Sequence, residues 1–336
     1  MTEPRIAVDA MGGDHGPSEI VAGALLAAQA GYGRILLVGD EARVRPFVRG
    51  PGSEHIEIIH AQEEVPMDVN ASQALKGADR TSLGIAVNLV KSREADAVVS
   101  AGNSGAFLAI ALIKLRTIEG IARPAIASVW PALKGPSVVL DSGANMDCKP
   151  EWLMQFGIMG SAYAKAVLGI ENPRVAILSV GEERSKGNAL TLEAAALLDA
   201  APVNFIGNVE GKDMFANVAD VIVADGFVGN VALKTSEGIL SRLADVMRDE
   251  IMASGPLAML GAALLRPTLR NFRTRFDYET HAGGPLLGLR GNCIVTHGRV
   301  SKNGMRHAIR IAAEQVRKDV VGNIGQLVAP IIAKEA

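Results

Sequence analysis

Short apolar runs alternate with helical segments along almost the whole of this chain, and this alternation restricts the folds that it can adopt. Many of the runs are continuously apolar, as expected for parallel strands that are covered on both faces. The predicted strands are Ile6–Asp9, Ile35–Val38, Ile56–His60, Ala97–Ser100, Ala125–Val129, Val138–Asp141, Val175–Ser179, Asn204–Ile206, Val221–Ala224 and Cys293–Thr296. Predicted helices between them include Glu19–Ala30, Leu83–Ser92, Trp152–Val167 and Leu190–Leu198. The alternation predicts a Rossmann-like, three-layer α/β/α fold with helices on both faces of a large, mostly parallel mixed sheet.

The composition agrees with one large α/β unit. The chain has 336 residues, of which 49% are hydrophobic and 21% charged, and this is ample for a large core. We find no repeat, low-complexity tract or flexible linker, so residues 1–336 are treated as a single unit. The net charge of −2 gives no indication of nucleic-acid binding. The first residues lead into a strand without the apolar segment of a signal peptide, which predicts a cytoplasmic protein.

No pattern for a metal or a nucleotide cofactor stands out in the sequence. The two cysteines, Cys148 and Cys293, lie far apart and have no second cluster of ligands, so neither a disulfide framework nor a zinc site is predicted. A buried thiol at Cys148 is favoured over a reactive one. The expectation is therefore a protein that needs no cofactor and no metal.

A glycine loop between a strand and a helix is the first candidate for a site. The apolar run Ala97–Val99 leads into Ser100–Gly105, and an apolar helix follows at once. Such a loop aims backbone N–H groups and the positive end of a helix dipole at one point, which favours an anion such as phosphate. A tight turn whose glycines only relieve strain is the alternative interpretation. The spacing matches neither a Walker A motif nor a nucleophile elbow, so Ser104 is interpreted as a hydroxyl donor rather than a nucleophile.

Polar glycine turns also follow four other predicted strands. These turns are Asp9–Pro17, Asp141–Asn145, Gly181–Asn188 and Asp225–Asn230, with Lys234 one helical turn further on. Each alone could be an ordinary turn in which Asp or Asn caps the next helix. Ligands of α/β folds bind outside the carboxyl ends of the strands, so five such turns together predict the rim of one polar cleft. The candidate phosphate- and substrate-binding residues are Asp9, Gly12, Gly13, Asp14, Gly102, Asn103, Ser104, Gly105, Asp141, Asn145, Glu183, Asn188, Asp225, Gly226 and Lys234.

Several blocks of the sequence resemble the PlsX-type phosphate acyltransferases of bacterial phospholipid synthesis. They are VDAMGGDHGP (Val8–Pro17), SAGNSGA (Ser100–Ala106), DSGANMDCKPE (Asp141–Glu151), GEERSKGN (Gly181–Asn188), GNVEGKD (Gly207–Asp213), DGFVGNVALKTSEG (Asp225–Gly238) and GGPLLGLRG (Gly283–Gly291). The blocks come in the family's order and span nearly the whole chain, so the resemblance is very specific.

The resemblance implies a reaction, a fold and partners. The reaction would transfer a fatty acyl group from acyl carrier protein to inorganic phosphate, and coenzyme A thioesters are a second possible donor. The fold would be similar to those of phosphotransacetylases and of the isocitrate and isopropylmalate dehydrogenases. The protein would be a homodimer, and its acyl phosphate would feed a separate, membrane-bound glycerol-3-phosphate acyltransferase.

For the predicted reaction, the protein needs mainly to position the substrates and to stabilise the negative charge that develops. Phosphate is already a nucleophile near neutral pH, and the leaving thiol has a pKa of about 8.5, near that of cysteine. The enzyme must hold phosphate against the thioester and stabilise the oxyanion of the tetrahedral intermediate. Lys186 and Asn230 are the candidates for this role, together with backbone N–H groups of the glycine turns. His15 is the acid–base candidate, with a structural or capping histidine as the alternative.

Three other functions compete with this interpretation. A phosphotransacetylase that uses short acyl-CoA is the nearest rival, although the Leu- and Met-rich stretch Leu257–Leu265 favours a long acyl chain. An NAD-dependent decarboxylating dehydrogenase would need a dinucleotide fingerprint or a cluster of metal-binding carboxylates. A membrane-associated scaffold would leave the five polar turns unexplained.

A second surface is predicted in the helical apolar and basic segment at about residues 240–290. Ile251–Phe276 contains no acidic residue, and Leu265, Leu269, Phe272 and Phe276 would share one helical face. Arg266, Arg270, Arg273 and Arg275 lie in the same stretch, which is too short to span a bilayer. A dimer interface, a peripheral membrane contact and a docking site for the acidic carrier protein remain open at this point.

Overall fold

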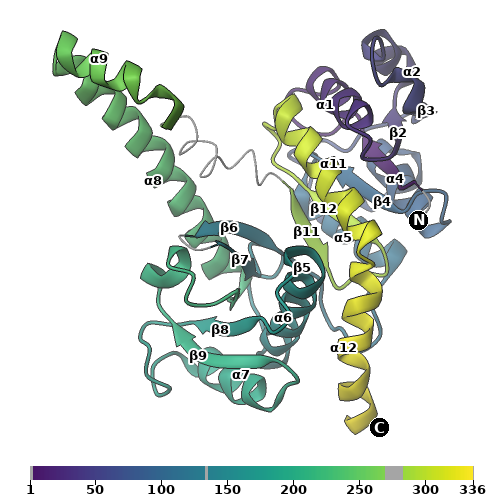
Figure 1. Ribbon diagram of the computed structural model, residues 1–336. Helices are drawn as coiled ribbons and strands as arrows, with labels where there is room; N and C mark the ends of the chain where they lie inside the picture. The colour runs from purple at the N-terminus through teal and green to yellow at the C-terminus, as the bar shows by residue number, and fades with distance from the viewer. Residues whose placement is uncertain (1–2, 133–134, 269–282, 336) are drawn as a thin grey trace.

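The strands of the protein form two separate sheets. The computed structural model describes residues 3–132, 135–268 and 283–335 (Figure 1). Within them, a seven-stranded sheet has the order β3-β2-β1-β4-β12-β11-β5, and a five-stranded sheet has the order β6-β7-β10-β8-β9. The predicted α/β fold with mostly parallel strands is confirmed, but its strands are divided between two sheets.

The first sheet is parallel except at one edge. The parallel strands are β1 (Arg5–Asp9), β2 (Arg34–Gly39), β3 (Ile56–His60), β4 (Ala97–Ser100) and β12 (Asn292–Val295). Next to β12, the antiparallel β11 (Gly284–Leu287) pairs in turn with β5 (Ala125–Ile126). Helices α1 (Ser18–Gln29) and α11 (Lys302–Arg317) bury one face, and α4 (Ser82–Lys91) and α5 (Ser104–Leu115) bury the other.

The second sheet has the same layered construction. β7 (Gly135–Leu140), β10 (Val221–Val223), β8 (Arg174–Leu178) and β9 (Asn204–Val209) are parallel, and β6 (Ser128–Ala132) runs antiparallel to β7. Helices α6 (Pro150–Tyr163, continued by a π-helical turn at Ala164–Leu168), α7 (Ala189–Ala200) and α12 (Val320–Glu335) cover one face. The short η5 (Gly211–Phe215) and the start of α8 (Gly226–Ala253) cover the other. The remaining short helices are α2 (Glu41–Val44), α3 (Ala71–Ala74), η1 (Arg45–Phe47), η2 (Ser53–His55) and η3 (Ala78–Arg80).

The segment from β5 to β6 joins the two sheets. Sequence patterns predict one strand at Ala125–Val129, whereas the structure divides it between β5 of the first sheet and β6 of the second. Between them, the amide of Ala127 donates a 2.8 Å hydrogen bond to the carbonyl of Pro285. Helix α12 packs against α6 of the second half and follows α11 of the first, so the last helix of the chain also connects the two halves (Figure 1).

Helices α8 and α9 (Pro256–Leu264) project from the body as a helical hairpin (Figure 1). The chain reverses at Gly255, whose φ of 87° is in the left-handed region that glycine tolerates. Large apolar side chains are exposed along both helices. Leu265 and Arg266 are exposed just beyond α9, whereas the rest of the predicted amphipathic face, from Leu269 to Phe276, lies outside the described residues. In the part of the chain described here, no helix is both long and apolar enough to cross a bilayer.

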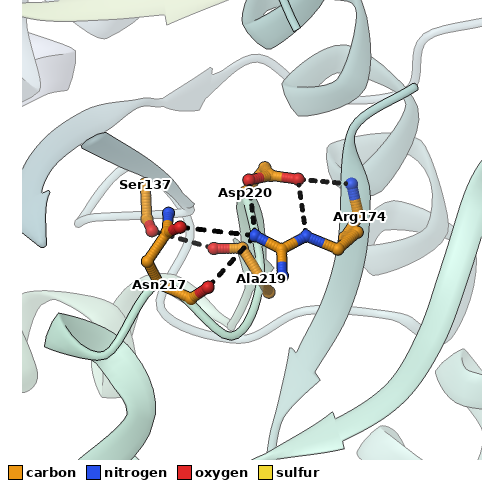
Figure 2. A network of polar contacts seen from close by, with 5 residues as sticks. All are labelled: Ser137, Arg174, Asn217, Ala219 and Asp220. Carbon is orange, nitrogen blue, oxygen red and sulfur yellow. Dashed lines mark hydrogen bonds and ion pairs between the residues drawn. The ribbon is translucent and has the colours of Figure 1, made fainter. Parts of the chain in front are cut away.

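An ion-pair network secures the amino-terminal ends of the second sheet (Figure 2). The Asp220 carboxylate accepts hydrogen bonds from the backbone amide of Arg174 at 2.8 Å and from its guanidinium at 2.9 and 3.0 Å. The same guanidinium donates to the carbonyl of Asn217, and the Ser137 hydroxyl donates to the carbonyl of Ala219. Arg174 begins β8 and Asp220 directly precedes β10, so these contacts lie at the amino-terminal ends of the strands, opposite the carboxyl ends that carry the candidate site.

Candidate functional site

The first cluster of predicted site residues lies where β1 and β4 end side by side. From β1 the chain goes through α1 to β2 on one side, whereas β4 lies on the other, so this is a topological switch point. The buried Asp9 carboxylate accepts hydrogen bonds from the Ser100 hydroxyl at 2.7 Å and from the amide of Met11 at 3.2 Å. Burial raises the pKa of Asp9 although these hydrogen bonds act to lower it. Asp9 therefore fixes the two turns.

Glycine allows these two turns to touch. A β-carbon at Gly12 would lie 2.7 Å from both the amide nitrogen of Gly102 and a carboxylate oxygen of Asp9. Gly13 has a φ of 93°, which also favours glycine. The sequence GG at this turn therefore serves the close approach of its backbone to Gly102, two residues before α5, and the backbone amide of Gly12 donates to Asp9.

Asn103 connects the glycine loop to α5 and to a neighbouring segment. Its side-chain oxygen accepts from the amide of Ala106 at 2.9 Å, and its side-chain amide donates to the carbonyls of Met67 and Val69. Ser104 and Gly105 follow in the exposed first turn of α5, and His15 lies exposed in the turn before α1. Asn103 is thus a helix cap, as the simpler interpretation expects, and it also fixes the loop that would hold an anion.

A third turn, which the sequence analysis did not include, completes this cluster. It follows β12, where the carbonyl of Gly298 accepts a 2.7 Å hydrogen bond from the amide of Asp14. Arg299 lies exposed with its Nε 3.6 Å from Oδ2 of Asp14. The available signal was the run Thr296-His297-Gly298-Arg299, a glycine between two basic residues directly after a predicted strand.

The second cluster is built on Asp141 at the end of β7. Its buried carboxylate accepts hydrogen bonds from the amides of Ile126, Gly143, Ala144 and Asn145 at 2.7 to 3.1 Å, and from the Asn145 side chain at 2.9 Å. Burial raises the pKa of Asp141 even though these donors act to lower it. With both oxygens committed to the turn, Asp141 orients the backbone of this turn.

The start of α8 packs directly onto the Asp141 turn. Asp225 caps the helix by accepting from the amide of Val228 at 2.8 Å, and the amide of Gly226 donates to the carbonyl of Asn145. A β-carbon added at Gly143 would lie 3.5 Å from Cγ of Asn230, so the Asn230 amide lies beside this turn. The structure therefore brings Asp141, Asn145, Gly226 and Asn230 together.

The Gly181–Asn188 turn follows β8 at the same edge of the second sheet. Asn208 fixes it by donating to the carbonyls of Glu183 and Lys186, and Asn188 caps α7 through the amide of Thr191. The side chains of Glu183 and Lys186 are exposed. Across residues 3–132, 135–268 and 283–335, no hydrogen bond or ion pair connects this turn to either of the two clusters.

Helix α8 links the two clusters across the two sheets. Lys234 donates a 2.8 Å hydrogen bond to Glu237, and Nε2 of His297 lies 3.5 Å from the other carboxylate oxygen of Glu237. Burial alone would raise the pKa of Glu237, but the hydrogen bonds and positive charges of His297 and Lys234 outweigh it and hold that pKa below its usual range. The contact between Glu237 and His297 was not predicted, because no sequence pattern connects these two residues.

The site offers donors for an anion rather than ligands for a metal. Among the described residues, no group of three or more His, Cys, Asp or Glu side chains is arranged to hold a metal ion. Cys148 is half-buried beside the Asp141 turn, and burial raises the pKa of its thiol to about 11. This thiol is therefore protonated near neutral pH and is a poor nucleophile.

Solved structures with the same fold define the structural class. A phosphotransacetylase from Streptococcus pyogenes superposes with a TM-score of 0.66 at 18% identity, covering 94% of each chain. A putative 4-hydroxythreonine-4-phosphate dehydrogenase from Salmonella typhimurium gives 0.56 at 14% identity, covering 94% of this chain and 99% of the other. The predicted similarity to the phosphotransacetylase fold is confirmed, and at these identities the likeness concerns the fold alone.

Sequence comparison then gives the family. The model of a family described as "Fatty acid synthesis protein" matches residues 4–323. A phosphate acyltransferase of Pelotomaculum thermopropionicum is 46% identical over 333 residues, covering 99% of this chain and 97% of its own. One from Desulforudis audaxviator is 47% identical over 320 residues, covering 95% of both. The chain belongs to this fatty acid synthesis protein family, so the predicted PlsX-type acyltransferase is confirmed.

Proposed function

We propose that this chain transfers a fatty acyl group from acyl carrier protein to inorganic phosphate, producing acyl phosphate for phospholipid synthesis. A phosphate oxygen attacks the thioester carbonyl carbon, the C–S bond of the tetrahedral intermediate breaks, and the carrier thiolate leaves. The observation that carries the proposal is the pair of polar glycine clusters, linked across the two sheets through α8, in a member of this family. The proposal includes acyl carrier protein as the acyl donor, phosphate as the acceptor, and a reaction that needs no cofactor.

The first cluster is the proposed phosphate seat. The Gly12–Gly13 turn packs against Gly102 just before α5, where the helix dipole, the Ser104 hydroxyl and the amide of Gly105 favour an anion. Gly102, Asn103 and Asp14 hold the surrounding turns in place. His15, at the edge of this seat, stays the candidate for proton transfer, with a structural role as the alternative.

The second cluster is the proposed site for the reacting carbonyl. The Asn230 amide can donate to the oxyanion of the tetrahedral intermediate, because Asp141 and Asp225 fix the backbone on both sides of it. Lys186 approaches from the turn after β8 and would supply a positive charge to the phosphate or to the oxyanion. Glu183 and Asn188 hold that turn in shape.

A direct assay tests the proposal. Purified protein is incubated with palmitoyl-carrier protein and phosphate, and acyl phosphate is trapped with hydroxylamine. We expect acyl hydroxamate to form without added metal or nicotinamide and to persist with a chelator. Formation of acetyl phosphate from acetyl-CoA, with no product from palmitoyl-carrier protein, would instead identify a phosphotransacetylase. Loss of turnover with chelator and its return with a divalent ion would refute the metal-free mechanism.

A homodimer formed through α8 and α9 is part of this proposal. Val228, Ile239, Leu243 and Val246 form an apolar row on the side of α8 opposite Asn230, Lys234 and Glu237, and they are 42 to 61% exposed. An exposed row of this length on a projecting helix is typical of a surface that another chain covers. We assign it to a second copy, whose hairpin would pack against this one.

Weak contact with the cytoplasmic face of the membrane is the other proposed interaction. Leu257, Leu260 and Leu264 lie at i, i+3 and i+7 on α9 and are 59 to 83% exposed. The arginines of the following segment could meet anionic headgroups. Such contact would place the acyl phosphate near a membrane-bound glycerol-3-phosphate acyltransferase, the enzyme proposed to consume it.

A further inference from the structure

Glu237 occupies a position between the two halves of the site that neither the sequence motifs nor the proposed mechanism explains. Asn230, Lys234 and Glu237 follow one another at i, i+4 and i+7, so they lie along one face of α8. The Glu237 side chain is only 23% exposed, whereas its two partners, Lys234 and His297, are 51% and 45% exposed. An acidic group is thus kept partly buried between two basic ones, at the junction of the two sheets.

A chain of contacts leads from Glu237 to the proposed phosphate seat. Glu237 meets His297 in the turn after β12. The next residue, Gly298, accepts the hydrogen bond from the amide of Asp14, and its carbonyl would lie 2.8 Å from a β-carbon at Gly13. A displacement of His297 would therefore move the carbonyl of Gly298, which holds Asp14 and lies close to Gly13. The position of these residues decides where the N–H groups of the seat point.

We propose that Glu237 is a positioning residue that holds the His297–Arg299 turn against the phosphate seat and thereby sets its affinity for phosphate. This inference rests on the proposed function for its link to turnover, but the phosphate affinity can be measured without it. Glu237 acts through His297 and does not itself touch the substrate. The acyl donor, which meets the second cluster, should be bound as before.

The test combines kinetics, calorimetry and a double-mutant cycle. We expect Glu237→Ala to raise the phosphate KM about tenfold, with less than a twofold change in the KM for acyl-carrier protein. Calorimetry with inorganic phosphate alone should show the same loss of affinity. Because Glu237 acts through His297, the double variant Glu237→Ala/His297→Ala should be no more than about twofold worse than the poorer single variant. A loss in the double variant equal to the product of the two single losses, or an unchanged phosphate affinity in Glu237→Ala, would overturn the proposal.

Control variants distinguish a positioning role of Glu237 from a folding defect and from failure of the proposed acyl transfer. Asp245→Ala removes an acidic residue of the same helix that pairs with Arg242 and Arg248 at 3.7 and 3.8 Å, away from the site, and should leave the phosphate KM unchanged. Glu237→Gln keeps the shape of the side chain and its acceptor oxygen, so its affinity for phosphate should lie between those of wild type and Glu237→Ala. It replaces Glu237→Ala in the test if the alanine variant does not fold. If the wild-type protein makes no acyl phosphate, the proposed function fails, whereas the calorimetric comparison still decides the role of Glu237.

Discussion

Lys186 is exposed, but the turn that carries it is held firmly. Its carbonyl accepts hydrogen bonds from the Ser179 hydroxyl at 3.0 Å and from Asn208 at 3.1 Å. A long cationic side chain on a fixed turn can reach a dianion without the turn having to reorganise. The proposed role of Lys186 thus rests on the geometry of its backbone and on its position after the carboxyl end of β8.

The first prediction concerns Lys186. Lys186→Ala should lower kcat/KM at least about tenfold, which is roughly 1.4 kcal/mol of transition-state stabilisation. Lys212 is the matched control, since it is also exposed near this turn but pairs with Glu182 and Glu210 at 3.1 and 3.2 Å. Lys212→Ala should leave turnover unchanged. Equal kinetics for a folded Lys186→Ala protein and the wild type would show that Lys186 is only a surface charge.

Asp220 gives a prediction about stability rather than activity (Figure 2). Burial acts to raise the pKa of Asp220, but the hydrogen bonds and charge of Arg174 outweigh it and lower that pKa below its usual value. Asp220→Asn should cost roughly 2 kcal/mol in the free energy of unfolding at pH 7, measured by denaturant titration.

The sign of the pH dependence follows from the lowered pKa of Asp220. The ionised form is favoured in the folded state, so its contribution is complete above the unfolded pKa, which is about 3.9. The contribution is lost as the pH falls through the lower folded value. The difference between wild type and Asp220→Asn should therefore shrink in acid, and a constant difference from pH 7 to pH 3 would contradict this account. Acyl phosphate formation should be unaffected, because the network lies at the opposite edge of the sheet.

At the scale of whole elements, the first turn of α8 must lie close to the end of β7. A β-carbon at Gly229 would collide with the carbonyl oxygen of Asp141, so Gly229→Ala would push α8 away from the Asp141 turn. We expect this variant to lose most of its activity and to unfold at a lower temperature. Gly238, on the same helix, has open space around its α-carbon. Gly238→Ala should therefore raise the stability by about 0.5–1 kcal/mol and leave activity intact.

Local patterns predicted the elements well because each apolar run becomes a strand or helix largely through its own composition. All ten predicted strands have counterparts, and β11 was missed because the short run Gly284–Leu287 begins with Gly and Pro, both typical of turns. Asn103, Asn188 and Asp225 are capping residues, as the simpler interpretation of each turn expects. Capping and site formation coincide here, because the cap is also what fixes the turn at the end of each strand.

Contacts between distant segments could not be predicted in this way. The division of the strands between two sheets depends on β5 and β6 pairing with different partners, which two adjacent apolar runs do not reveal. The link between Glu237 and His297 joins positions sixty residues apart, and neither stands in a pattern that points to the other. The five polar turns accordingly form two clusters and a separate Lys186 turn, where one continuous rim was predicted.

At the scale of the whole molecule, the apolar row of α8 predicts the oligomeric state. The wild-type protein should behave as a dimer in light scattering coupled to size-exclusion chromatography. Ile239→Glu with Leu243→Glu places two charges in the middle of the row and should give a folded monomer at micromolar concentration. Arg248→Glu, on the opposite face of the same helix, is the control. A wild-type monomer, or a dimer that survives both charges, would remove α8 as the interface.

Contact with the membrane is tested by vesicle flotation. The same experiment distinguishes a membrane from carrier protein or a second copy of the chain as the partner of α9 and the segment after it. Wild-type protein should float with anionic vesicles at low salt, because Leu257, Leu260 and Leu264 can enter the interface while nearby arginines meet the headgroups. Each arginine near the surface contributes about 1 kcal/mol, and salt screens this contribution. Binding should therefore fall as salt rises and be weaker on neutral vesicles.

The matched variants change charge and apolar area separately. Arg270→Glu with Arg273→Glu should weaken flotation without unfolding the protein, and Leu257→Ser with Leu264→Ser should weaken it on anionic and neutral vesicles alike. Activity on soluble palmitoyl-carrier protein is measured in parallel, since the carrier is acidic and could dock on the same arginines. If the charge reversal lowers activity while flotation is unchanged, the arginines bind carrier protein. If wild-type protein does not float even at low salt, the apolar face of α9 is covered by protein and the membrane contact is refuted.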